Sequence, residues 1–138
     1  DTGGEWERWA VVYYVQQLSQ IELDPKPYPI PAHPAFGDAE KRAAGRLYLT
    51  HCVKCHGQKG HGDGVAADTL KDAAGNPMKP RNLAAEPMAG GSEPEQLFYR
   101  IRLGMAGTPM EPPESYPAQQ DKDAWALAEY VLMLREAK

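Results

Sequence analysis

The sequence predicts an all-α fold whose helices are joined by long loops that need a bound group to pack on. Three segments of the chain repeat apolar residues at three- to four-residue spacing, and no segment shows a clear alternation of apolar and polar residues. The 13 glycines and 13 prolines exclude much of the chain from helix interiors. Because long loops without a partner are uncommon in compact domains, we expect a ligand to organise them.

Length and charge exclude several classes of protein. At 138 residues the chain is the size of one typical domain, so we expect a single core with an appendage. A net charge of -4 and scattered lysines and arginines argue against nucleic acid as a partner. The longest apolar run, Trp9 to Val15, is far shorter than the roughly 20 residues of a membrane-spanning helix. The chain begins at Asp1 without a charged-then-apolar leader, so we expect a removed export signal or a fragment.

The first helix of the main domain is predicted over residues 38–55. Asp38 is a suitable N-cap, and apolar residues such as Leu47 follow with helical spacing. The glycines and prolines of residues 57–91 then predict a loop, with at most a short helix from Val65 to Ala73.

Two more helices are predicted in the second half of the chain. Ser92–Leu103 begins with a capping box formed by Ser92 and Glu95, and Gly104 ends it. After another loop rich in glycine and proline, residues 121–137 form an amphipathic terminal helix. Its apolar positions are Trp125, Ala128, Val131, Leu132 and Leu134.

Both cysteines belong to one motif, Cys52-Val53-Lys54-Cys55-His56. The pattern C-x-x-C-H is the covalent attachment site of a c-type haem, in which two thiols add to the vinyl groups and the histidine binds the iron. On one helical turn the thiols at i and i+3 share a face. Three other interpretations stay open: a thioredoxin-type pair, which needs a preceding strand; a zinc site, which needs a fourth ligand; and a disulfide, which leaves His56 unexplained.

Further features follow a fixed order along residues 38–138. They are Tyr48, the cysteine motif, Gly60-His61-Gly62-Asp63-Gly64, Pro80-Arg81-Asn82-Leu83, Ile101, Gly104, Gly107-Thr108-Pro109-Met110-Glu111-Pro112 and Tyr130. In this order they resemble the class I c-type cytochromes, an all-α fold around one covalent haem. Two positions depart from the family: Val65 stands where proline is frequent, and Ala44 stands where glycine is usual, with Gly45 beside it. We therefore expect a slightly wider crossing of the first and last helices.

The resemblance implies a single haem c held by Cys52 and Cys55, with His56 as one axial ligand of the iron. It also implies that the carbonyl of Pro80 accepts a hydrogen bond from His56, which would orient the ring and raise its basicity. Buried propionates need hydrogen-bond donors. Candidate donors are Arg81, Arg100, Arg102, Tyr99 and Trp125.

The second axial ligand is predicted to be a methionine. A thioether favours ferrous iron and raises the reduction potential relative to two imidazoles. Met110 lies in a loop stiffened by Pro109 and Pro112, and its context matches the family's ligand. Met105 is the main rival, followed by a histidine such as His61 or by no sixth ligand. The remaining methionines are Met78, Met88 and Met133.

Residues 1–37 are predicted to be an extension of the haem domain. We expect a helix over residues 5–20, with a strand as the open alternative, and an extended proline-rich strap over residues 24–36. Residues 9–18 match residues 125–134 at five of ten positions, which favours a common origin over chance. We expect the strap to dock the first helix on the haem domain, the alternative being a spacer from an upstream anchor or subunit. The residues that docking would bury are Trp6, Trp9, Tyr13 and Tyr14.

The resemblance implies a monomeric one-electron carrier of a respiratory chain rather than an enzyme. Its partners would be a quinol-oxidising complex or dehydrogenase as donor and a terminal oxidase or reductase as acceptor. The protein would contact these partners through apolar surface and a few charged side chains such as Lys54, Lys59 and Lys79. Because haem c is attached after export, we expect the bacterial periplasm or the outer face of a membrane. Two alternatives are the haem domain of a larger oxidase or multihaem oxidoreductase subunit that relays electrons internally, and a haem enzyme or gas sensor with an open sixth position.

Overall fold

The computed structural model describes residues 10, 14–15, 30–85, 88, 90–113 and 117–137. The chain divides into two compact units, residues 1–30 and 31–138. Most of the predicted helix at 5–20, its predicted docking, and the strap up to residue 29 lie outside the described residues. The described helical residues of the first unit are Ala10, Tyr14 and Val15.

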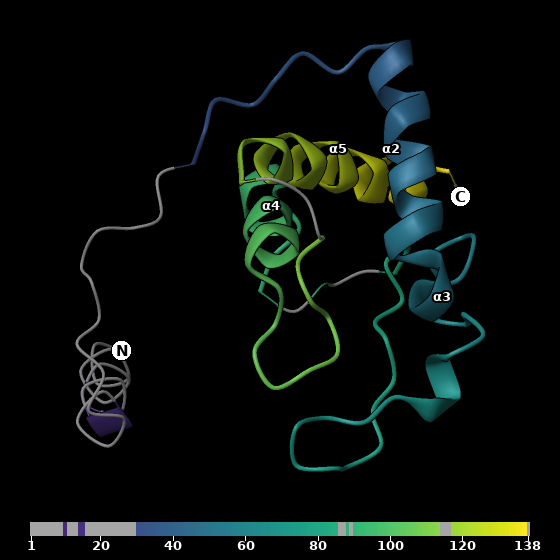
Figure 1. Cartoon of the computed structure of the whole chain (residues 1–138), viewed down its shortest axis with the longest axis vertical. Coiled ribbons are helices and arrows are strands. Elements are labelled where there is room, and N and C mark those ends of the chain that lie inside the picture. Colours follow the sequence, from purple (N-terminus) through teal and green to yellow (C-terminus); the bar gives the residue numbers. More distant parts are fainter. Residues whose placement is uncertain are drawn as a thin grey trace, which may run out of the picture. The chain divides into compact units, whose positions relative to one another are not determined.

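The described part of the second unit is helical, which confirms the predicted all-α class. Its elements are α2 (Asp38–His51), α3 (Val53–His56), the short 3-10 helix η1 (Ala67–Thr69), α4 (Pro94–Leu103) and α5 (Pro117–Glu136). α5 packs against both α2 and α4, and α3 directly continues α2 (Figure 1). Among the described residues, β pairing is limited to one isolated bridge between Lys71 and Pro77. None of the helices described here is both long and apolar enough to cross a membrane.

The crossing of α2 and α5 is built on two aromatic rings. The ring centroids of Tyr48 and Tyr130 lie 4.9 Å apart, and both Tyr48 and Ala44 are fully buried. A Cβ added to Gly45 would meet the Tyr130 ring at 3.6 Å, an ordinary van der Waals distance. The small residues at this crossing therefore let the two helices approach while a large aromatic pair fills the remaining space.

A second cluster fills the space between α4 and α5. Phe98 is fully buried and stacks on Trp125 with ring centroids 4.6 Å apart. Each large apolar side chain that is fully buried stabilises the fold by roughly 1.5–3 kcal/mol. The buried members of the cluster are Met88, Leu97, Phe98, Ala124, Trp125, Ala128 and Val131. This cluster fixes α4 against α5 and so fixes where the loop after α4 begins.

The end of the proline-rich segment lies on α5. The indole Nε1 of Trp125 donates a hydrogen bond to the carbonyl of Pro31 at 3.2 Å. His33 packs on the same indole, with centroids 4.5 Å apart, and its Nε2 lies 2.9 Å from a carboxylate oxygen of Glu129. The sequence analysis placed residues 31–37 in the extension, whereas these contacts group them with the second unit.

Several helix ends differ from the predictions by a few residues. Gly37, not Asp38, is the N-cap of α2, and its N–H donates to Oε2 of Glu40 at 3.0 Å. The N-cap of α4 lies one residue later than predicted, at Glu93, because Pro94, which has no N–H to lose, occupies the first helical position. Its capping pair is therefore Glu93 and Gln96 in place of Ser92 and Glu95, with Glu93 N–H donating to Gln96 at 3.1 Å.

Three longer predicted segments also differ from the structure. The helix predicted over 38–55 is divided at Cys52 into α2 and α3. The short helix predicted from Val65 to Ala73 is only the 3-10 turn η1, and the terminal helix begins earlier, at Pro117. In α5, as in α4, proline suits the first turn, where its missing N–H costs no hydrogen bond.

Candidate functional site

The cysteine motif forms one tight turn at the junction of α2 and α3. The N–H of Cys52 closes α2 by donating to the Tyr48 carbonyl at 2.9 Å. The Cys52 carbonyl then accepts from the N–H groups of Cys55, at 3.2 Å, and His56, at 2.8 Å. One carbonyl thus ties both sulfur-bearing residues and the imidazole into a single turn, as covalent attachment of a planar group with an axial imidazole requires.

Burial keeps the Cys52 thiol neutral. Burial, followed by the charge of Cys55, raises the pKa of the Cys52 thiol to about 12. A thioredoxin-type pair needs the opposite, a thiolate stabilised at neutral pH. Both cysteines are free, and the described residues contain no cluster of three or more histidine, cysteine or acidic groups able to hold a metal ion. The redox-pair, zinc and disulfide interpretations therefore have no support in the described structure.

The imidazole of His56 is oriented by a backbone carbonyl. Its Nδ1 lies 3.0 Å from the carbonyl oxygen of Arg81. The sequence assigned this role to Pro80, which is wrong by one residue. The Pro80 carbonyl instead faces Gly62, where an added Cβ would lie only 2.6 Å from it. The turn at Gly62, with φ of 78°, occupies the space beside Pro80 and leaves the next carbonyl for the imidazole.

The Arg81 contact decides how His56 can bind a metal. When Nδ1–H donates to the carbonyl, Nε2 carries the lone pair and is the ligand atom. Burial lowers the pKa of His56, and the Arg81 carbonyl opposes this shift by stabilising the protonated ring. The neutral, ligating tautomer is thus favoured by the surroundings of the ring.

The glycine-rich loop after the motif wraps closely around α3. The buried hydroxyl of Tyr48 donates to the Gly57 carbonyl at 2.7 Å, and burial raises the pKa of this phenol. The N–H of Gly64 donates to Cys55, and a Cβ on Gly64 would lie 2.3 Å from the Lys54 carbonyl. Only glycine allows the loop to approach this turn so closely. The glycine-rich loop therefore holds the cysteine motif against α2.

The loop of residues 104–113, here called the Met110 loop, is closed by its own hydrogen bonds. The N–H of Met105 donates to the Met110 carbonyl at 2.9 Å and so joins the two sides of the loop. The hydroxyl of Thr108 donates to the Met105 carbonyl at 2.8 Å and accepts from the Met110 N–H at 3.1 Å. Gly104 has φ of 70°, and a Cβ there would lie 2.7 Å from the Met110 carbonyl. The backbone of Met110 is therefore fixed before any ligand binds.

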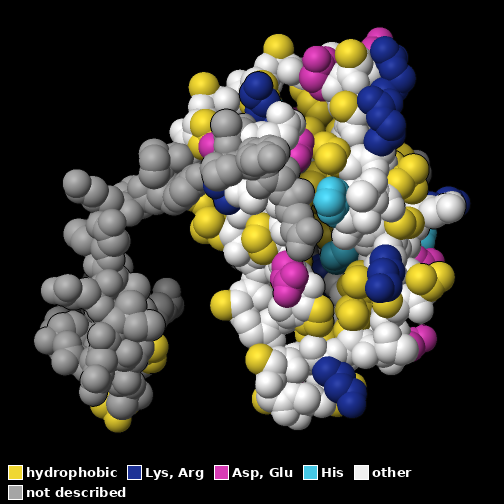
Figure 2. All heavy atoms as spheres, in the orientation of Figure 1, with side chains coloured by type: hydrophobic (Ala, Val, Ile, Leu, Met, Phe, Trp, Pro, Cys, Tyr) yellow, Lys and Arg dark blue, Asp and Glu magenta, His cyan; other side chains and the backbone are white. Residues whose placement is uncertain are grey.

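The motif and the Met110 loop form walls of the same cavity. It encloses about 940 Å³, part of which is open to solvent, and its lining is mostly apolar. Figure 2 shows hydrophobic side chains gathered on this face of the molecule, with histidine among them. The lining residues are His51, Cys52, Cys55, His56, Leu70, Met78, Lys79, Pro80, Arg81, Ile101, Met105, Thr108, Pro109, Met110, Glu111, Pro113 and Leu127.

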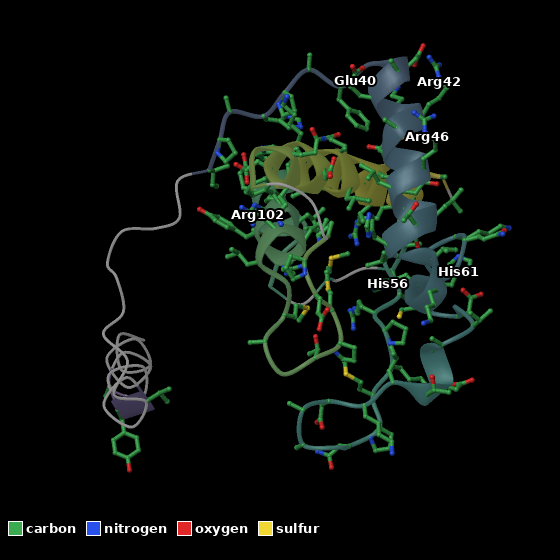
Figure 3. The ribbon with its side chains drawn as sticks, viewed as in Figure 1. Glu40, Arg42, Arg46, His56, His61 and Arg102 are labelled. Carbon is green, nitrogen blue, oxygen red and sulfur yellow. The ribbon has the colours of Figure 1, made fainter. Side chains whose placement is uncertain are left out.

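The cavity separates the candidate axial ligands into two groups. Met110 and its rival Met105 both line it, as does Met78. Met88 belongs instead to the buried cluster of α4 and α5. His61 does not line the cavity, and in Figure 3 it lies on the other side of α3 from His56.

Most of the predicted propionate partners point elsewhere. Only Arg81 among them lines the cavity. Arg100 donates to the Gly91 carbonyl at 2.8 Å, and Arg102 pairs with Asp121 at 2.6 Å. Lys79, which the sequence did not suggest for this role, also lines the cavity and lies 3.0 Å from an Asp68 carboxylate oxygen.

Sequence reasoning missed some of the cavity walls. Leu127 on α5 is almost fully buried and forms part of the lining, although it was not among the predicted apolar positions. The spacing of Leu127 from Ala124 and Val131 on one helical face was the available signal. His51 was not among the predicted site residues, yet it lines the cavity, as does Met78.

The donor set of this cavity fits a covalently bound haem. Two free thiols and an oriented imidazole lie on one wall, and thioethers lie on the facing loops. Cys52 and Cys55 would hold the group, His56 would bind its iron, and the apolar lining would exclude water from it. The chemistry that the group supplies when bound is a reversible one-electron change at the iron.

Comparison with known proteins agrees with this site. Residues 42–135 match the cytochrome c family. No curated protein matches the sequence. A solved structure, the Kuenenia stuttgartiensis reducing HAO-like protein complex Kustc0457/Kustc0458, contains a similar chain with a TM-score of 0.72 and 29% identity. The similarity covers 86% of this chain and 54% of that one, so this chain spans about half the length of its structural relative. The sequence match and the geometry of the site together show that the chain belongs to the cytochrome c family.

Proposed function

We propose that this protein is a one-electron carrier of a respiratory chain, with a single haem c ligated by His56 and Met110. The observation that carries the proposal is that an imidazole oriented by Arg81 and a closed methionine loop line the same apolar cavity. Cytochrome c membership indicates electron transfer through haem. The axial pair and the role in respiration are the parts that we propose.

The chain's own residues account for the requirements of a carrier. Met110 supplies a thioether, which favours the ferrous state relative to a second imidazole. The hydrogen bonds between Met105, Thr108 and Met110 hold this ligand in place through oxidation and reduction. Apolar walls such as Leu127 and Ile101 exclude water, so little solvent has to reorganise when the charge at the site changes.

We propose a quinol-oxidising complex or dehydrogenase as electron donor and a terminal oxidase or reductase as acceptor, outside the cytoplasm. The structural relative belongs to a protein complex, which supports redox proteins as partners. Lys54 and Lys79 are exposed, and Lys79 lines the cavity itself. A brief, small interface around these charges and the apolar rim suits rapid exchange of electrons.

The ligand assignment is tested by the optical spectrum of the oxidised holoprotein. A bond from sulfur to ferric iron gives a weak charge-transfer band at the red end of the spectrum. We expect this band in the unmodified protein and in Met105→Ala, and its loss in Met110→Ala. Loss in Met105→Ala alone would move the ligand to Met105. A high-spin spectrum of the unmodified protein would contradict the carrier assignment and indicate a haem protein with an open sixth coordination position.

The carrier role needs a separate test. Membranes of the source organism supplied with a quinol should reduce the added ferric holoprotein, and oxidase-containing membranes should reoxidise it. A protein with the sulfur band that exchanges electrons with neither kind of membrane would contradict the role of a free carrier. That result would turn attention to relay within a larger subunit.

A further inference from the structure

Residues 70–78, here called the clamp hairpin, form a small folded element beside the cavity. The N–H of Met78 donates to the Leu70 carbonyl at 3.0 Å, and the N–H of Asp72 donates to the Asn76 carbonyl at 3.0 Å. These bonds flank the bridge between Lys71 and Pro77. The two ends of the hairpin, Leu70 and Met78, both line the cavity.

The carboxylate of Asp72 organises the turn of the clamp hairpin. Its Oδ1 accepts from the N–H groups of Ala74, at 2.9 Å, and Asn76, at 2.8 Å. Its Oδ2 accepts from the side-chain amide of Asn76 at 3.0 Å. These bonds lower the pKa of Asp72, so the carboxylate is charged and charge-assisted hydrogen bonds hold the turn at neutral pH.

The tip of the hairpin is bonded to the Met110 loop. The N–H of Ala73 donates to the Gly107 carbonyl at 2.9 Å. Gly107 lies next to Thr108, whose hydroxyl joins Met105 to Met110. The other hydrogen bonds described above for the Met110 loop join its own residues, so the Ala73 bond ties that loop to a distant part of the chain. Both loops lie below α4 and α3 in Figure 1.

We propose that the clamp hairpin holds the Met110 loop closed over the haem, with Asp72 as the positioning residue. Asp72 fixes the turn, the turn presents the Ala73 N–H, and that N–H fixes Gly107 within the loop that carries the sixth ligand. Breaking the clamp frees the loop to swing outward, and external ligands then reach the iron more readily. This inference rests on the proposed ligation by Met110.

The test is the affinity of the ferric holoprotein for imidazole, which competes with the methionine for the iron. We expect Asp72→Ala to bind imidazole about fivefold more tightly, the scale expected for the loss of one net hydrogen bond. Asp72→Asn keeps an acceptor for the backbone N–H groups and should restore much of the original affinity. Ala73→Pro removes the N–H that reaches Gly107, and it should act in the same direction as Asp72→Ala.

The control variant is Asp68→Ala, which removes an equal charge from an exposed site next to Lys79. We expect it to leave imidazole affinity unchanged. If Asp68→Ala and Asp72→Ala change the imidazole affinity equally, the effect comes from net charge alone and the proposal is overturned. A lower melting temperature of Asp72→Ala with unchanged imidazole affinity would also overturn it, because that result describes a purely structural residue. The proposed function fails separately, if the unmodified protein lacks the sulfur-to-iron band.

Discussion

The Nδ1 of His56 lies 3.0 Å from the carbonyl oxygen of Arg81, so a backbone group holds the proposed axial ligand. Substitution of the Arg81 side chain leaves this carbonyl in place. A change in the packing of the neighbouring backbone can displace the carbonyl. Gly62 controls this packing, because a Cβ added there would lie 2.6 Å from the carbonyl oxygen of the preceding residue, Pro80.

We predict that Gly62→Ala lowers the stability of the holoprotein by more than the strain of placing alanine at a positive φ. The new methyl group displaces residues 80–81 and weakens the His56 hydrogen bond. Overpacking of this kind costs about 1–3 kcal/mol. The control is Gly75→Ala, since Gly75 has φ of 86° and open space around its Cβ position. Thermal unfolding measures both, and equal losses of stability would show that the approach to Pro80 is unimportant.

At the Met110 loop, Gly104→Ala is expected to weaken the bond between sulfur and iron. Its Cβ would lie 2.7 Å from the Met110 carbonyl, whereas a Cβ on Gly107 would meet nothing. Both glycines have positive φ, so Gly107→Ala carries the same conformational cost of about 1 kcal/mol without the collision. The sulfur-to-iron band should weaken in Gly104→Ala and persist in Gly107→Ala. A band unchanged in both variants would contradict the close approach of Gly104 to the Met110 carbonyl.

A third prediction concerns the hydroxyl of Thr108. Thr108→Val removes the hydrogen bonds to Met105 and Met110 at nearly constant volume, so each lost bond costs about 1 kcal/mol. The freer loop should bind imidazole more tightly. Thr50→Val, which loses only an exposed bond to Arg46 on α2, is the matched control and should bind imidazole as the unmodified protein does. Indistinguishable affinities would show that Thr108 does not hold the ligand loop.

Acid should open the clamp hairpin. Hydrogen bonds from Asn76, first from its side chain and then from its backbone, lower the pKa of Asp72 below the usual 3.8. A carboxyl group with a lowered folded-state pKa stabilises the fold above its unfolded-state pKa, and this contribution is lost as pH falls through the folded-state value. Imidazole affinity corrected for imidazole protonation should therefore rise below about pH 4. Asp72→Ala should lack this rise, and a rise of the same size in that variant would exclude Asp72 as its source.

Local patterns predicted the chemistry of the site better than its exact contacts. The turn that joins Cys52, Cys55 and His56 depends on neighbouring residues, so the motif alone was enough to expect it. The choice between the Pro80 and Arg81 carbonyls depends on the direction of each carbonyl, which the packing of Gly62 decides. Composition and periodicity do not depend on which of two adjacent carbonyls faces the imidazole, so they cannot predict it.

The clamp hairpin was harder to predict for a related reason. Asp72 and Asn76 suggest a turn, but the bond from Ala73 to Gly107 joins two loops far apart in the sequence. Similarly, the N-cap of α4 was predicted one residue early because Ser92 is the better capping side chain, while Pro94 sets the actual start. Tertiary contacts and proline geometry outweighed local preference in these places.

The hydrogen bond from Trp125 to Pro31 anchors the segment before α2 at a point on α5. A second contact, between His33 and Glu129 of α5, lies two residues further along the same segment. Leu127 lies between Trp125 and Glu129 in sequence and forms part of the cavity wall. The anchor point of Pro31 and one wall of the cavity therefore belong to the same helix, α5.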